Sequence, residues 1–309
     1  MTADDAVGTL SWRALLAETT AILGAADEAR WIALAASGRD LTEWTLGLDD
    51  PANERAVARL DGMVARRRAG EPLQYVLGSW PFRRIELIVD RRVLIPRPET
   101  EEVVEVALAI ARDLPAPRTV VDLGTGSGAI ALSLAAELPL GSTQVWATDV
   151  SPDALDVARA NLAGLGRPAA HVRVAAGSWF AALPGELRGR LDLVVANPPY
   201  VAADDEVDEV VRAWEPAQAL WSGDDGLDAI REIVEAAPAW IRPGGWLVLE
   251  IGATQGGAVV AALASAGFDP VSIRSDGGGR DRVAVARRAG VGRAGAGQDG
   301  CGRAAEGRG

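Results

Sequence analysis

The chain has 309 residues, enough for one α/β domain and a smaller one, and 49% of them are hydrophobic, as in globular proteins. A net charge of −12 argues against a nucleic acid as main partner, while a single cysteine (Cys301) and a single histidine (His171) exclude an internal disulfide, a zinc site and a Ser-His-Asp triad. No apolar run could span a bilayer, and the first five residues lack the features of a signal peptide, so we expect a cytoplasmic protein with no metal and no membrane partner.

Residues 1–70 show helical periodicity and no strand pattern. Apolar residues recur at helical spacing before Gly24 and again before Gly38, and glycine commonly follows the last residue of a helix. A further helix is expected to start with Asp50 as its N-cap and Pro51 at its first position, and to end near Gly70. The sequence therefore predicts a small helical domain over residues 1–70.

Residues 71–98 change to alternating apolar residues, as in Ile85, Leu87 and Val89, which predicts a β-hairpin that links two domains. Residues 96–101 contain two prolines and two glutamates and mark the start of an amphipathic helix, because proline suits the first helical position and acidic side chains complement the helix dipole. A second domain is expected over residues 99–288.

A glycine-rich loop follows the first strand of this domain. The loop is Gly124-Thr125-Gly126-Ser127-Gly128, and a helix follows it. Glycines in this order let a ligand approach the N–H groups at the helix N-terminus. A second strand ends about 20 residues later at Asp149, where a carboxylate can accept both hydroxyls of a ribose. The pattern predicts a nucleotide-type cofactor site.

This pattern permits two classes of cofactor. Gly124, Gly126 and Ala129 also satisfy the dinucleotide fingerprint, with Asp149 in the ribose position, as in a nicotinamide-dependent oxidoreductase. Asp122, just before the loop, instead suits the ammonium group of S-adenosylmethionine better than a pyrophosphate.

A second motif, Asn197-Pro198-Pro199-Tyr200, follows the apolar run Leu191–Ala196, which predicts a buried parallel strand. Two prolines here can simply end a strand in a turn. They also remove N–H groups, so the backbone offers carbonyl acceptors without competing donors. A planar NH2 group could donate to the Asn197 side-chain oxygen and the Pro198 carbonyl while its flat face lies against Tyr200. Together with the glycine loop, this predicts a site that holds an NH2 nucleophile for attack on an electrophile.

Seven strands are expected in the second domain, near Val120, Val145, Val172, Val194, Leu247, Ile273 and Val285. Helices between most of them predict an α/β fold with a seven-stranded, doubly wound, Rossmann-like sheet, whose last two strands form a hairpin around residues 276–280. Residues 289–309 are rich in Gly, Ala and Arg and predict a disordered tail.

These motifs resemble the family of peptide chain release factor N5-glutamine methyltransferases (PrmC/HemK), which are class I S-adenosylmethionine-dependent methyltransferases. The likeness runs from about residue 10 to residue 287. It rests on Gly70-Glu71-Pro72, Leu94–Glu101, Asp122–Gly128, Asn197–Tyr200, Glu215-Pro216, Ala219-Leu220, Asp225–Leu227, Pro243–Gly245 and Glu250. The glycine loop and Asn-Pro-Pro-Tyr occur in many amino-methylating enzymes, whereas Leu94–Glu101 and the helical N-terminal domain narrow the match.

The resemblance implies that S-adenosyl-L-methionine is the cofactor. It implies that the cofactor contacts Asp122, the loop Gly124–Gly128, Asp149, Trp179 and Asn197, with Trp179 beside the adenine. Ser178 stands before this tryptophan, where the family commonly has Asp. Asn197, Pro198, Pro199 and Tyr200 would hold the substrate, which is the glutamine in the Gly-Gly-Gln loop of a class I release factor, and the helical domain would dock this protein partner.

Three other functions share part of the pattern. A DNA adenine N6-methyltransferase would have the same loop and the same Asn-Pro-Pro-Tyr motif, but it should carry a basic DNA-facing surface, which an acidic chain lacks. A nicotinamide-dependent oxidoreductase and a non-catalytic module that binds S-adenosylmethionine are the others.

Overall fold

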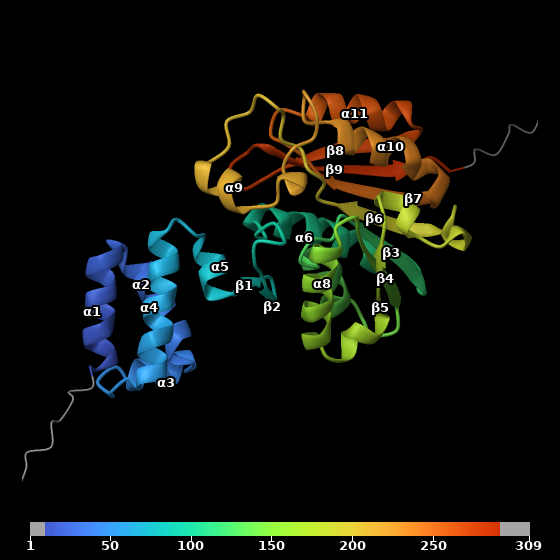
Figure 1. Ribbon diagram of the computed structural model, residues 1–309. Coiled ribbons are helices and arrows are strands. Elements are labelled where there is room, and N and C mark those ends of the chain that lie inside the picture. Colours follow the sequence, from blue (N-terminus) through green and yellow to red (C-terminus); the bar gives the residue numbers. More distant parts are fainter. Residues whose placement is uncertain (1–9, 291–309) are drawn as a thin grey trace, which may run out of the picture.

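The computed structural model describes residues 10–290, which form a helical unit, a β-hairpin and an α/β unit (Figure 1). Apart from its first two residues, the tail predicted over residues 289–309 lies outside this part of the chain, as does Cys301. Among the helices of residues 10–290, none combines the length and the apolar character needed to cross a bilayer.

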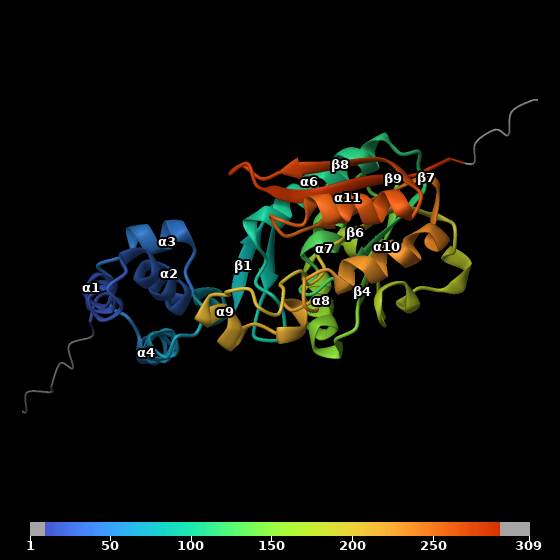
Figure 2. The same ribbon diagram turned by 90° about the horizontal axis from the view of Figure 1, so that it is seen from above.

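Five helices make up the first unit, which lies to one side of the sheet in both views (Figures 1 and 2). They are α1 (Trp12–Leu23), α2 (Ala26–Ser37), α3 (Leu41–Leu46), α4 (Glu54–Arg68) and α5 (Leu73–Leu77). As predicted, Gly24 and Gly38 follow the first two helices in the left-handed conformation, with φ of 68° and 69°. The helices bury a core of their own around Trp12, Trp44 and Leu60.

Helix α4 begins later than the sequence suggested. Its N-cap is Asn53, whose side-chain oxygen accepts a hydrogen bond from an N–H of the first turn at 2.9 Å. The backbone around Pro51 pairs instead with the segment before α1, where the N–H of Ala52 donates to the carbonyl of Leu10 at 2.9 Å. Because this backbone binds to another segment, it cannot form the first turn of a helix, and the predicted start at Asp50 was wrong.

The link between the two units contains the predicted hairpin, formed by β1 (Ser79–Phe82) and β2 (Ile85–Ile88). Helix α5 precedes it, although the sequence suggested only strand in this stretch, and Gly78 ends the helix with φ of 82°. Arg83 in the hairpin turn contacts Glu137 at 2.6 Å and Glu105 at 2.8 Å. These two ion pairs attach the hairpin to helices of the α/β unit.

The α/β unit is built on a seven-stranded sheet with the order β5-β4-β3-β6-β7-β9-β8, which confirms the predicted fold class. The strands are β3 (Arg118–Leu123), β4 (Thr143–Asp149), β5 (Val172–Ala176), β6 (Leu191–Ala196), β7 (Ile241–Glu250), β8 (Phe268–Ser275) and β9 (Asp281–Arg288). The strands from β5 to β7 are parallel, and β9 lies antiparallel between β7 and β8. From β3 the chain adds β4 and β5 toward one edge of the sheet, and from β6 it builds toward the other edge. The boundary between β3 and β6 is therefore the topological switch point, where open α/β sheets bind ligands.

Helices cover both faces of this sheet (Figure 1). On one face lie α6 (Pro98–Asp113), α7 (Ala129–Glu137) and α8 (Pro152–Gly164), and on the other α10 (Asp228–Trp240) and α11 (Gly256–Ser265). Successive strand residues alternate between the two cores, so that Val120 and Val195 face the first core while Val121 and Val194 face the second. Helix α9 (Glu209–Trp214) lies in the long connection after β6.

Candidate active site

The glycine loop connects the carboxyl end of β3 to α7. Gly124, Gly126 and Gly128 all have positive φ, of 73°, 56° and 89°, which explains why the loop needs glycine at these positions. The N–H of Thr125 donates to the carbonyl of Thr148 at 2.8 Å, which fixes the loop to the neighbouring strand β4. A Cβ placed on Gly126 would meet no atom within 4 Å, so the loop presents bare backbone.

Asp122 lies beneath this loop and is fully buried. One of its carboxylate oxygens, Oδ2, accepts hydrogen bonds from the Thr125 hydroxyl at 2.6 Å and the Ala131 N–H at 3.1 Å. Its other oxygen accepts none from the described residues. Burial is the main cause that raises the pKa of Asp122 to about 7. The structure therefore places Asp122 under the loop and not among the residues that line the pocket.

Asp149 ends strand β4 and lines the pocket. Its two oxygens accept hydrogen bonds from the N–H groups of Gly126 and Ser151, both at 2.9 Å. The carboxylate therefore joins the glycine loop to the start of α8 and keeps lone pairs for a further donor from the pocket.

Trp179 closes another side of the pocket, next to Gly177 and Ser178. Its indole N–H donates to a carboxylate oxygen of Glu232 on α10 at 2.9 Å, which fixes the ring. A Cβ on Gly124 would lie 3.3 Å from this ring, so the loop and the indole are in close contact. Trp179 has φ of 43°, an uncommon value for a residue with a side chain.

The Asn-Pro-Pro-Tyr motif leaves the carboxyl end of β6, beside the glycine loop. Asn197 and Pro199 line the pocket, whereas Pro198 is buried and Tyr200 does not line it. The Tyr200 hydroxyl contacts Glu250 at 3.3 Å, and burial raises the pKa of Tyr200 to about 12. The structure thus brings Asn197 and Pro199 together with the cofactor loop and keeps the Tyr200 hydroxyl among buried groups.

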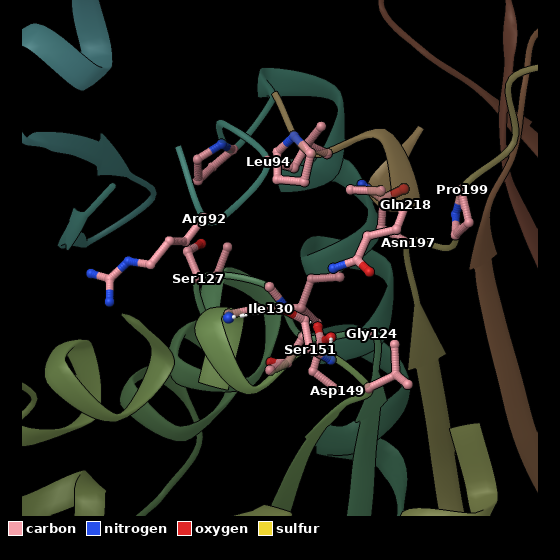
Figure 3. Close-up of a pocket in the computed structure, with 18 of the residues that line it drawn as sticks. Arg92, Leu94, Gly124, Ser127, Ile130, Asp149, Ser151, Asn197, Pro199 and Gln218 are labelled. Carbon is pink, nitrogen blue, oxygen red and sulfur yellow. Dashed lines mark hydrogen bonds between the residues drawn. The ribbon is translucent and has the colours of Figure 1, made fainter. Parts of the chain in front are cut away.

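All these walls enclose one pocket of about 180 Å³ (Figure 3). Two segments that carried no predicted role complete it, which we call the first strap (residues 92–97) and the second strap (residues 215–219). Arg97 of the first strap contacts Glu215 of the second at 2.5 Å, and the other oxygen of Glu215 accepts from the Ile95 N–H at 3.0 Å. The sequence predicted no role for either strap in the pocket. Their only signal was that residues of both belong to the motifs that carry the family resemblance.

Asn161 on α8 connects the pocket to the hairpin. Its side chain donates to the carbonyl of Ser127 in the glycine loop at 2.9 Å and to the carbonyl of Ile88 at 3.0 Å, and it accepts from the N–H of Ile88 at 2.7 Å.

We expect Asn161→Ala to lower the free energy of unfolding by about 2 kcal/mol, because three hydrogen bonds of a buried carboxamide are lost. Denaturant unfolding measures this. Arg159→Ala, an exposed position on the same helix, serves as the control, and equal stability of the two variants would contradict the expectation.

Comparison with known proteins identifies the family. Residues 11–78 match the PrmC N-terminal domain, and residues 106–219 match the methyltransferase small domain. A release factor glutamine methyltransferase from Cereibacter sphaeroides is 45% identical over 265 residues, which are 85% of this chain and 91% of that protein. One from Geobacter sulfurreducens is 40% identical over 281 residues, with coverage of 90% and 95%. A solved protein-(glutamine-N5) methyltransferase from Alicyclobacillus acidocaldarius is 29% identical, covers 63% of this chain and 94% of that chain, and has a TM-score of 0.39. The resemblance predicted from the motifs is confirmed, and the chain belongs to the release factor glutamine methyltransferase family.

Proposed function

We propose that the chain transfers a methyl group from S-adenosylmethionine to the side-chain amide nitrogen of the glutamine in the Gly-Gly-Gln loop of class I release factors. One observation supports this most strongly: Asn197 and the glycine loop line the same pocket. A group that accepts hydrogen bonds from an NH2 nucleophile therefore lies within reach of a loop suited to the methyl donor. The names of the relatives supply the class of substrate.

The residues present suit S-adenosylmethionine. The open backbone face at Gly126 allows close approach of a ligand, and the carboxylate of Asp149 lines the pocket where a ribose needs an acceptor. The ring of Trp179, fixed by Glu232, offers a flat surface for the adenine. Asp122 supports the loop from beneath through Thr125. When bound, the cofactor supplies an electrophilic methyl group on a sulfonium.

The residues of the chain then promote the transfer by positioning and polarising the glutamine amide. The nitrogen of an amide is a poor nucleophile because its lone pair is delocalised. The side-chain oxygen of Asn197, which lines the pocket, accepts one N–H of the glutamine amide, and this bond becomes stronger as positive charge develops on the nitrogen. The Pro198 carbonyl is the acceptor predicted for the other N–H, although Pro198 is buried and is not part of the pocket wall. The ring of Pro199 supplies an apolar wall. After transfer, the nitrogen loses a proton to water.

The charge of the chain supports a protein substrate over DNA. Five acidic residues lie exposed shortly after the Asn-Pro-Pro-Tyr motif: Asp204, Asp205, Glu206, Asp208 and Glu209. This acidic segment would repel the phosphates of a duplex and would attract a basic protein surface. The five-helix unit, attached through the hairpin, offers a second surface for a protein partner.

A comparison of acceptors tests this proposal. The chain is incubated with labelled S-adenosylmethionine and either a class I release factor or an adenine-containing DNA duplex, and the incorporated label is counted. We expect label in the release factor and none in the DNA. Label in the DNA, with the release factor unmodified, would assign the chain to adenine methylation instead.

A further inference from the structure

A row of polar side chains continues from Asn197 into the protein interior. The Asn197 amide nitrogen Nδ2 lies 3.2 Å from the hydroxyl oxygen of Thr100, which lies 2.7 Å from the carboxylate oxygen Oε2 of Glu250. The other Glu250 oxygen, Oε1, accepts from the Tyr200 hydroxyl at 3.3 Å. Thr100 is 4% exposed and lines the pocket beside Asn197, whereas Glu250 is 0% exposed and lies behind them, out of contact with water.

The fold brings these residues together from three separate elements. Ala196 of β6 pairs with Leu249 of β7, so the following residues, Asn197 and Glu250, leave adjacent parallel strands side by side. Thr100 lies in the first turn of α6, which packs against both strands. The row is therefore a consequence of the sheet register and of where α6 begins.

The number of protons that these side chains can donate determines which end of the Asn197 carboxamide faces Thr100. A threonine hydroxyl has one proton, and the short contact to the carboxylate of Glu250 takes it. The Thr100 oxygen can then only accept from Asn197, so the NH2 end of the Asn197 carboxamide must face Thr100. The oxygen of that carboxamide is consequently left for the pocket, where Asn197 is seen among the lining residues (Figure 3). Without this constraint, the two ends of a carboxamide are nearly equal in shape and can exchange.

We propose that Thr100 and Glu250 are positioning residues, which hold the Asn197 carboxamide with its oxygen toward the amide nitrogen that receives the methyl group. This inference rests on the proposed function, because it assigns the orientation of the acceptor that the reaction needs. Neither residue has to touch the substrate for this role.

The charge of Glu250 should matter for the same reason. Burial is the main cause that raises the pKa of Glu250 to about 7, while Thr100, Tyr200 and Arg282 favour the charged form and Glu99 opposes it. Above this pH the carboxylate accepts from Thr100. Below it, a protonated Glu250 can donate to Thr100, whose own proton then becomes available to the oxygen of the Asn197 carboxamide. The orientation is lost, so kcat is expected to fall as the pH falls through about 7.

Two substitutions at Thr100 separate orientation from packing. Thr100→Val keeps the shape and removes the hydroxyl, whereas Thr100→Ser keeps the hydroxyl. We expect Thr100→Val to lower kcat on a release factor about tenfold, with the KM for the release factor and the Kd for S-adenosylmethionine nearly unchanged, and Thr100→Ser to restore most of the rate. Thr143→Val is the matched control, since Thr143 is also buried but begins β4, at the opposite end of that strand from Asp149.

A pH profile gives a readout that packing alone would not move. Glu250→Gln has no titratable group at this position, so its kcat, whatever its level, should keep its value from pH 8 down to pH 6, where the wild-type rate falls. Asp122, whose pKa is also about 7, is present in both enzymes, so the difference between the two profiles belongs to Glu250.

The outcomes distinguish this inference from the proposed function. If the wild-type chain methylates the release factor and Thr100→Val has wild-type kcat, or if Thr100→Ser is as slow as Thr100→Val, the positioning role is wrong and the function stands. If the wild-type chain itself transfers no methyl group to the release factor, the proposed function fails.

Discussion

Replacing Asn197 by alanine is expected to lower kcat for methyl transfer by about 100-fold to 1,000-fold, the usual cost of removing one hydrogen-bonding group that acts in the transition state. The Asn197 side chain is placed to accept from the nucleophile, so its loss removes both the alignment and the polarisation of the amide. The Kd for S-adenosylmethionine should change little, because the glycine loop, Asp149 and Trp179 are intact in this variant. Steady-state kinetics on a release factor and calorimetry with the cofactor measure the two quantities.

Gln144→Ala provides the control for this prediction. Gln144 is a half-buried carboxamide on β4 of the same sheet, bonded to the carbonyl of His171 and distant in the strand from Asp149. Its removal should leave kcat unchanged. A wild-type kcat for Asn197→Ala would show that Asn197 does not hold the nucleophile.

Replacing Asp149 by alanine is expected to raise the Kd for S-adenosylmethionine by about 10-fold to 100-fold, since a hydrogen bond to a charged acceptor contributes about 1.5 to 3 kcal/mol. The structure adds a second reason for this weaker binding of S-adenosylmethionine. The carboxylate also accepts from the N–H groups of Gly126 and Ser151, so its removal releases the glycine loop from the end of β4. Calorimetric titration with the cofactor measures the change.

Two further variants test whether the weaker cofactor binding of Asp149→Ala is specific to this carboxylate. Asp153→Ala removes an exposed carboxylate in the first turn of α8, close in sequence to Asp149 but not in the pocket wall, and should bind the cofactor normally. Asp149→Asn keeps the shape and one acceptor oxygen, so its Kd should lie between the wild-type and alanine values. An unchanged Kd for Asp149→Ala would mean that this carboxylate does not receive the ribose.

Sequence patterns were sufficient to predict the sheet and the pocket residues that follow its strands. All seven strands lie where they were predicted. The signal was strongest for central strands such as β6, because strands buried on both faces need continuous apolar residues, whereas the edge strand β8 is mostly exposed. The parallel order then brings the carboxyl ends of β3, β4 and β6 to one edge, so the loop, Asp149 and Asn197 meet in one pocket. The chemistry suggested for Asp122 and Tyr200 depended on where their side chains point, and the structure buries Asp122 and leaves Tyr200 outside the pocket wall.

Contacts between distant segments were beyond the reach of local patterns. Arg97 and Glu215 are 118 positions apart, and Thr100 and Glu250 are 150 apart, so no spacing rule connects them. The wrong start of α4 has the same origin. Asp50 and Pro51 are good local signals for a helix start, but pairing with the segment before α1 occupies their backbone.

Peptide mass mapping of a class I release factor, after incubation with the chain and S-adenosylmethionine, tests the central claim most directly. We predict one added methyl group, on the side-chain nitrogen of the glutamine in the Gly-Gly-Gln loop, and no methylation of a release factor in which alanine replaces that glutamine. A methyl group on another residue, or methylation that survives the loss of the glutamine, would contradict the account.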